Sequence, residues 1–176
     1  MDTKSHWEKV YRTKRPNEVS WYRPHLEISL QLIEDAAPNH NAQIIDVGAG
    51  ESTLVDDLMA REYRNVYVLD VSSMALEVAK GRLGASANQV ACLCGDVTTF
   101  GFSRYQFDVW HDRAVFHFCQ WLPMKIRERR FRCSTVSNVK GNGFVAAFLR
   151  DRVSGIASLW TARLLKGLGQ IAQALG

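Results

Sequence analysis

Acidic side chains and glycines stand where they could bind a nucleotide-like ligand. Residues 43–54 read Gln-Ile-Ile-Asp-Val-Gly-Ala-Gly-Glu-Ser-Thr-Leu, so that Asp46 shortly precedes Gly48 and Gly50. An apolar run, two glycines and a helical pattern in succession predict a buried strand, a tight turn and a helix start. Glycine suits such a turn because a Cβ would collide with a ligand lying against the backbone. The stretch therefore predicts a nucleotide-like ligand.

Two further acids follow strand-like runs later in the chain. Asp70 ends the run 66–70, at the distance from Gly50 where a nucleotide-binding βαβ unit places a carboxylate for the ribose hydroxyls. Asp96 follows the run 89–94, after Gly95. Ser72 or Ser73 can cap the helix behind Asp70. The alternative for each acid is a turn or capping residue.

The elements that position these residues alternate between strand-like and helix-like patterns. Strands are predicted at 43–47, 66–70, 89–94, from 107 onward and at 144–149, with helices at 24–37 and 52–61. Such alternation predicts an α/β fold, a doubly wound parallel sheet of strand order 3-2-1-4-5. Ligands of open α/β sheets bind at the carboxyl edge, so the acids are expected at one rim.

Several of these segments resemble the class I, seven-strand, Rossmann-like methyltransferases that use S-adenosylmethionine (AdoMet). The stretch 43–54 resembles their motif I, and 107–118 resembles their motif IV region. The aromatic segment 6–22 resembles the N-terminal part of small bacterial methyltransferases and of eukaryotic lysine methyltransferases similar to them. The resemblance implies AdoMet as cofactor. It implies that Asp46, Gly48 and Gly50 hold the methionine end, that Asp70 and Val71 hold the ribose, and that Asp96 and Val97 hold the adenine.

The resemblance implies a methyl acceptor that is either a small molecule or a protein. Four residues are candidates to face it: Trp21, Tyr22, Asp112 and Arg113. No catalytic base is predicted, and His117 is read as a packed or surface histidine. The segment 6–22 is expected either to seal the sheet edge or to act as a lid over cofactor and substrate.

Two other functions compete with methyl transfer. A nicotinamide-dependent oxidoreductase would use Asp70 equally well, although Thr53 stands where its fingerprint has a third glycine, and Asp46 and Asp96 would have no role. A non-enzymatic AdoMet-binding remnant is the second alternative, because the last third of the chain departs from the family pattern.

Composition indicates one ordinary soluble domain. The 176 residues are 47% hydrophobic and 23% charged. The polar start has no signal-peptide pattern, and the run 144–149 is too short to cross a bilayer, so a cytoplasmic location is expected. The four cysteines show no zinc-ligand spacing, and no metal is predicted. Oligomeric state is left open.

The charge changes sign along the chain. Residues 1–118 carry a net charge of −4 and residues 119–176 a net charge of +8.

We expect a core at 1–149, including a lid segment at 1–38, and a separate tail at 150–176. The core is expected to lack the family's last two strands, and 119–139 is expected to be a helix although it has no apolar stripe.

The tail 152–176 has an amphipathic helical pattern with basic residues off its apolar face. Three interpretations stay open: a helix that binds a membrane, nucleic acid or a partner; a helix that packs on the sheet; and an altered reading frame. An arginine cluster at 127–132 could attract phosphate, yet no recognition module accompanies it, so nucleic acid is not the expected partner.

Overall fold

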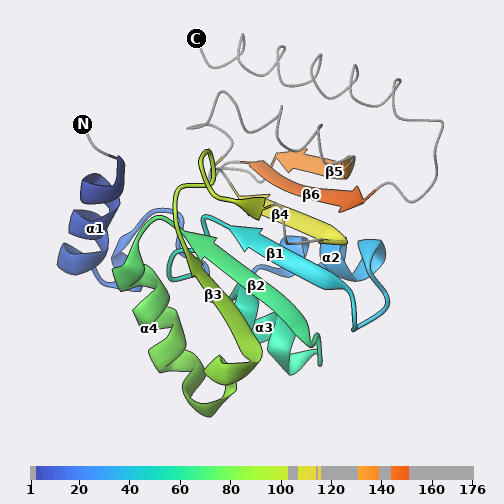
Figure 1. The fold of residues 1–176 in the computed structure, drawn as a ribbon, viewed down its shortest axis with the longest axis horizontal. Coiled ribbons are helices and arrows are strands. Elements are labelled where there is room, and N and C mark those ends of the chain that lie inside the picture. Colours follow the sequence, from blue (N-terminus) through green and yellow to red (C-terminus); the bar gives the residue numbers. More distant parts are fainter. Residues whose placement is uncertain (1–2, 103–106, 114, 116–130, 139–143, 151–176) are drawn as a thin grey trace, which may run out of the picture.

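The computed structural model describes residues 3–102, 107–113, 115, 131–138 and 144–150, the last two ranges by their backbone (Figure 1). In chain order the elements are α1 Thr3–Thr13, the 3₁₀ helix η1 Pro16–Glu18, α2 Glu27–Ala36, β1 Gln43–Val47, α3 Leu54–Ala60, β2 Asn65–Asp70, α4 Ser73–Leu83, the 3₁₀ helix η2 Gly84–Gln89, β3 Val90–Cys94, β4 Val109–Arg113, β5 Phe131–Asn138 and β6 Phe144–Arg150.

The strands form one sheet of order β3-β2-β1-β4-β6-β5. Strand β1 pairs in parallel with both β2 and β4, and β2 pairs in parallel with β3. Ile45 of β1 lies opposite Tyr67 on one side and Trp110 on the other. The predicted α/β class and the order 3-2-1-4 of the first four strands are confirmed.

The predicted direction of the strand at 144–149 is wrong. Strand β6 lies beside β4, as expected, but runs antiparallel to it, so the sheet is mixed. A second strand, β5, pairs antiparallel with β6 and forms the edge of the sheet. Only residues 139–143 separate β5 from β6, and so short a connection returns the chain antiparallel, because a parallel crossover needs a dozen residues or more.

Strand β5 also corrects the helix predicted at 119–139. Residues 131–138 are extended, and their sequence, with Thr135 and Val136, carries β-branched residues that favour a strand. Strand β6 is the predicted fifth strand, and β5 is an additional strand that the sequence did not predict. The expectation that the family's last two strands are missing concerns the chain after β6 and lies outside the described residues. The rest of the predicted helix, His117 and the tail at 151–176 lie outside the described residues.

Two apolar layers pack on the two faces of the sheet. Helices α2, α3 and α4 cover one face, where Ile33, Leu58 and Leu76 pack against strand residues such as Ile44 and Val68. Figure 1 shows α2 and α3 behind the strands. On the opposite face, in the described part of the chain, the segment after β3 packs on the sheet in a cluster formed by Ile45, Val47, Leu69, Val97, Phe102, Phe107 and Trp110. Helices α2, α3 and α4 thus pack on a face of the sheet, whereas α1 lies near its carboxyl rim.

Local signals set the helix ends near this rim. Ser72 is the N-cap of α4, and its hydroxyl accepts a hydrogen bond from the Ala75 N–H at 3.3 Å, which confirms the predicted cap. Helix α2 begins a few residues after Pro24, and α3 begins after the glycine turn. No helix in the described ranges is long and apolar enough to span a bilayer.

Candidate cofactor site

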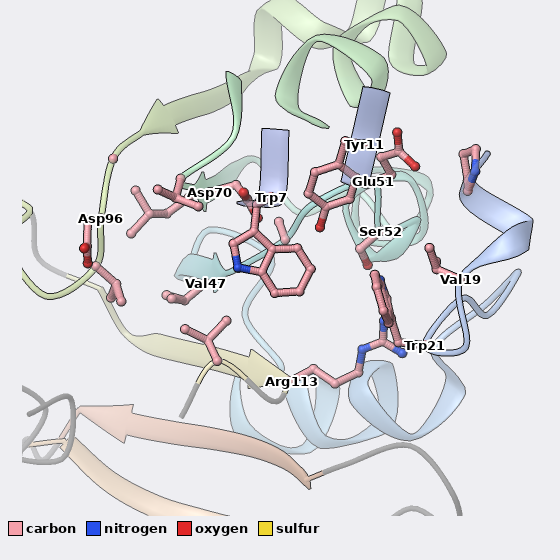
Figure 2. Close-up of a pocket in the computed structure, with 18 of the residues that line it drawn as sticks. Trp7, Tyr11, Val19, Trp21, Val47, Glu51, Ser52, Asp70, Asp96 and Arg113 are labelled. Atoms are coloured by element: carbon pink, nitrogen blue, oxygen red, sulfur yellow. The ribbon is translucent and has the colours of Figure 1, made fainter. Parts of the chain in front are cut away.

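A cavity of about 460 Å³ opens at the carboxyl ends of the four parallel strands. Ligand-binding cavities in proteins commonly measure about 300–1,000 Å³. Figure 2 shows Asp96 at one end of the cavity, Asp70 further along, and Trp21 with Arg113 at the other end. Of the predicted site residues, eight line its wall: Trp21, Tyr22, Gly48, Asp70, Val71, Asp96, Val97 and Arg113.

Asp70 connects the glycine turn to the N-terminus of α4 through hydrogen bonds. Its Oδ2 accepts a hydrogen bond from the Gly50 N–H at 2.8 Å, and its Oδ1 accepts one from the Ser72 N–H at 2.8 Å. Burial raises the pKa of Asp70 to about 6, and repulsion from Asp46 adds to the rise, although the backbone N–H donors oppose it. The carboxylate is thus pre-positioned at the cavity wall, where ribose hydroxyls could donate to its remaining lone pairs.

Gly48 and Gly50 both adopt left-handed backbone conformations, with φ of 65° and 53°. A Cβ on Gly48 would collide with the Val115 side chain, and one on Gly50 would collide with the phenolic oxygen of Tyr11. The sequence explained these glycines by contact with a ligand. The structure adds two causes, positive φ and the close approach of the protein's own side chains.

Asp96 and Val97 close the end of the cavity beside β3. The exposed carboxylate of Asp96 accepts hydrogen bonds at Oδ1 from the Thr98 N–H at 2.7 Å and the Thr98 hydroxyl at 2.6 Å. Val97 is buried, at 6% exposed. This pair provides a polar acceptor beside an apolar wall, which suits the amino edge and the face of a purine ring.

Asp46 lies beneath the cavity and does not line it. Its Oδ1 is 2.7 Å from His111 Nδ1, and His111 Nε2 is 3.0 Å from the Ser29 hydroxyl oxygen. All three residues are buried, each at most 3% exposed. Sequence reasoning missed His111, although the pairing of β1 with β4 places it directly opposite Asp46. The other Asp46 oxygen, Oδ2, is buried without a hydrogen-bond partner.

Helix α1 supplies aromatic side chains to the cavity wall. Trp7 and Tyr11 both line it, and their rings stack with centroids 6.0 Å apart. Trp7 also meets Trp21 edge to face at 5.7 Å. Burial raises the pKa of Tyr11 well above its usual value, and the nearby charges of Asp70 and Glu51 raise it further, so the phenol stays protonated. The sequence had singled out this aromatic segment.

The helix is anchored by Glu8, whose carboxylate accepts a hydrogen bond from the Ser73 N–H at 2.9 Å and lies 3.2 Å from the Ser73 hydroxyl oxygen. An anion is favoured there because the first turn of α4 presents unpaired N–H groups. The segment 3–22 therefore contributes part of the cavity wall.

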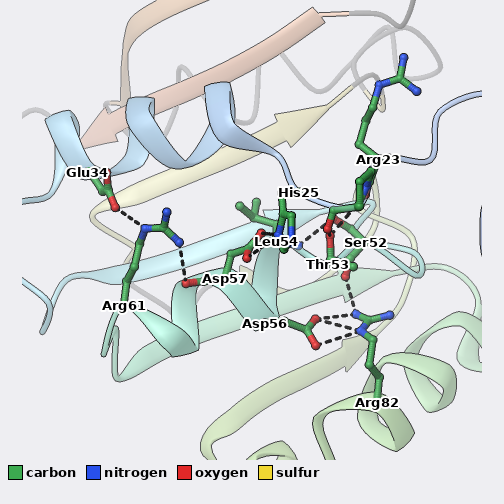
Figure 3. Close-up of polar contacts among 11 residues, drawn as sticks. Arg23, His25, Glu34, Ser52, Thr53, Leu54, Asp56, Asp57, Arg61 and Arg82 are labelled. Carbon is green, nitrogen blue, oxygen red and sulfur yellow. Dashed lines mark hydrogen bonds and ion pairs between the residues drawn. The ribbon is translucent and has the colours of Figure 1, made fainter.

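The loop after Gly50 is clamped by Arg82 of α4 (Figure 3). Its guanidinium donates to the carbonyls of Glu51 at 3.0 Å and Ser52 at 2.6 Å, and it pairs with the Asp56 carboxylate at 2.8 Å. On the other side, the Thr53 hydroxyl donates to the Pro24 carbonyl at 2.9 Å. Because Glu51 and Ser52 line the cavity, these contacts determine the shape of its wall. Arg82 was not singled out from the sequence.

Asp112 and Arg113, adjacent in β4, are placed differently. Asp112 is 1% exposed, does not line the cavity, and accepts a hydrogen bond from the Val115 N–H at 2.9 Å. Arg113 is half-buried and lines the cavity. The structure therefore brings Trp21, Tyr22 and Arg113 to the wall, but not Asp112. Across the described ranges, no cluster of three His, Cys, Asp or Glu side chains could hold a metal ion.

The residues present fit AdoMet. The buried Asp46 carboxylate, with one oxygen unpartnered, adds negative charge beneath the cavity, which favours a ligand that carries a positive charge. Asp70 and Asp96 supply acceptors along the same wall as the apolar Val97. The assignment of individual residues to ribose, adenine and methionine stays a prediction.

Comparison with known proteins agrees with this geometry. Residues 44–131, half of the chain, match the family described as methyltransferase domain. The eEF1A lysine and N-terminal methyltransferase of Mus musculus is 25% identical over 110 residues, which cover 62% of this chain and 16% of that protein. The chain thus spans about a sixth of the length of the curated relatives it matches.

Solved structures show the same fold. The magnesium protoporphyrin IX methyltransferase of Synechocystis PCC 6803 with bound SAM superposes with a TM-score of 0.58 at 11% identity, covering 86% of this chain and 98% of that one. An RNA methyltransferase from Salinibacter ruber in complex with S-adenosyl-L-homocysteine gives 0.57 at 12% identity, covering 77% and 99%. The comparisons give the oxidoreductase alternative no support.

Protonation of Asp70 is expected to weaken AdoMet binding. Because ribose hydroxyls donate to the ionised carboxylate, affinity should fall as pH drops through about 6, by up to about tenfold per pH unit. Asp70→Ala should raise Kd about 10- to 100-fold and flatten this pH dependence. Calorimetric titration between about pH 7.5 and about pH 5 measures both. A parent protein with constant Kd over this range contradicts the assignment.

Loss of the hydrogen bonds that the Arg82 guanidinium makes with Glu51, Ser52 and Asp56 is expected to make the cavity wall less ordered. Arg82→Lys keeps the charge but cannot serve two carbonyls and a carboxylate together, so AdoMet Kd should rise about tenfold. Arg61→Lys is the matched control, because Arg61 pairs with Glu34 and donates to the Asp57 carbonyl at the far end of α3 (Figure 3). Equal effects of both changes on Kd would show that the clamp only stabilises the fold.

Proposed function

The chain belongs to the methyltransferase domain family, whose members use AdoMet, and from that premise we propose that it methylates an amino group of a protein acceptor. One observation carries the proposal of methyl transfer. The glycine turn, Asp70 and Asp96 lie at the carboxyl ends of three different strands and meet at a single cavity. One adenosyl ligand can therefore contact all three.

When bound, AdoMet supplies a methyl group on a positively charged sulfur, which is already electrophilic. The chain's own residues have to align the acceptor with that carbon and exclude water. Gly48 permits close approach of the backbone, and the aromatic rings of Trp7 and Tyr11 cover the cavity from α1. No residue has to donate a proton in this step. The raised pKa of Tyr11 means that its phenol keeps its proton, so Tyr11 contributes to the cavity wall as a neutral side chain.

The cavity chemistry supports an amine as acceptor. Trp7, drawn in the middle of the cavity, and Trp21, drawn at the Arg113 end, present aromatic rings to it, and Glu51 lines the wall beside Tyr11 (Figure 2). Aromatic faces and a carboxylate attract an ammonium group through cation–π and charge interactions. Burial raises the pKa of Glu51, so this carboxylate can also accept the proton that the amine must lose before it attacks.

The choice of a protein as acceptor is supported by the curated relatives, which are named as lysine and N-terminal methyltransferases. Both activities in that name concern amino groups of a protein. A small-molecule amine is the alternative that the test below has to separate.

The test is incubation of the full chain with methyl-labelled AdoMet and fractionated extract. We expect label in the protein fraction, with acid hydrolysis releasing methylated lysine or a methylated N-terminal residue. Asp70→Ala should label about 10- to 100-fold less at limiting AdoMet, whereas Asp35→Ala, a change on the exposed face of α2, should label like the parent.

Two results would contradict the proposal in different ways. Label confined to low-mass compounds would overturn the protein acceptor and leave methyl transfer intact. Cofactor binding in calorimetry without label in any fraction would favour the non-enzymatic remnant.

A further inference from the structure

We propose that Arg113 binds the carboxylate of the cofactor's methionine moiety, and so selects for an intact amino acid at that end of the ligand. This inference rests on the proposed function. It also changes the expected role of Arg113, which the sequence placed among the residues facing the methyl acceptor.

The first argument is the order of the strands at the rim. Asp96 follows β3, Asp70 ends β2, Gly48 follows β1 and Arg113 ends β4, and these strands are neighbours in that order. Adjacent strands lie about 4.8 Å apart, so the end of β4 is about 10 Å from the end of β2. An adenosyl ligand with its adenine at Asp96 and its ribose at Asp70 would therefore extend its amino acid across β1 to β4.

The second argument is the burial of the Arg113 guanidinium and the hydrogen-bonding capacity that the described residues leave unused. It lines the cavity and is half-buried, yet no hydrogen bond or ion pair joins it to any residue in the described part of the chain. Burial lowers the pKa of Arg113, which shows that the protein leaves the charge poorly solvated. A half-buried guanidinium that no described residue pairs is poorly compensated, and a carboxylate ligand offers it two parallel hydrogen bonds.

The third argument is the charge beside Arg113. The groups that act on it electrostatically are Asp46, Arg23 and Tyr11. Asp46 sits one strand away in β1 with an orphaned buried oxygen, whereas Arg23 adds a second positive charge at the cavity wall. Two positive charges at the cavity wall complement the carboxylate of an amino acid, and the buried negative charge of Asp46 beneath the wall favours its ammonium at longer range.

The experiment compares AdoMet with decarboxylated AdoMet, which keeps the ammonium but lacks the carboxylate. In calorimetry the parent protein should bind AdoMet about 10- to 100-fold more tightly than the decarboxylated ligand. Arg113→Met keeps the length of the side chain and removes the charge. It should weaken AdoMet binding by about the same factor and leave the decarboxylated ligand within about threefold of the parent.

Two further variants keep this result interpretable. Arg113→Lys should restore part of the preference for AdoMet, because an ammonium still attracts a carboxylate but cannot form the bidentate pair. Arg61→Met removes a guanidinium from the far end of α3 and should keep the full preference. Circular dichroism confirms that each variant is folded before titration.

The proposal is overturned if Arg113→Met weakens both ligands equally, which indicates a structural role. It is also overturned if the variant binds both like the parent while its KM for the methyl acceptor rises, which would assign Arg113 to the acceptor. A parent protein that binds neither ligand would refute the proposed function itself, and the two failures are therefore distinguishable.

Discussion

The site depends on the parallel pairing of β3, β2, β1 and β4. Parallel strands end at the same edge, and each adjacent strand moves that end sideways by about 4.8 Å. The loops that carry Asp96, Asp70 and Gly48 therefore lie in a row, although they are far apart in the chain. Any of these strands running in the opposite direction would place its loop at the other edge and divide the cavity.

Burial of charge at this rim has a cost that the fold offsets in part. Backbone N–H groups of Gly50 and Ser72 stabilise the Asp70 carboxylate, and His111 with Ser29 does the same for one oxygen of Asp46. The raised pKa of Asp70 shows that this compensation is incomplete. Functional sites often retain such unfavourable groups, because a ligand completes their interactions.

The N-terminal segment and the sheet define the cavity together. Trp7 and Tyr11 approach the glycine turn from α1, while Arg82 holds the following loop from α4. The wall of the cavity is thus made by contacts between elements that are separate in sequence. This arrangement explains why the glycines at 48 and 50 face protein side chains, although only Gly48 also lines the cavity.

Local patterns in the sequence determined the positions of β1, β2, β3, β4 and β6, the glycine turn, the Ser72 cap and the acids at the ends of β2 and β3, because short-range periodicity and turn chemistry set these features. Tertiary structure decided the antiparallel direction of β6, the pairing of β5, the contact of His111 with Asp46, and the separation of Asp112 from Arg113 across the cavity wall. These features depend on strand pairing and side-chain packing between distant segments. Periodicity along one segment carries no information about which distant segment it meets, or in which direction.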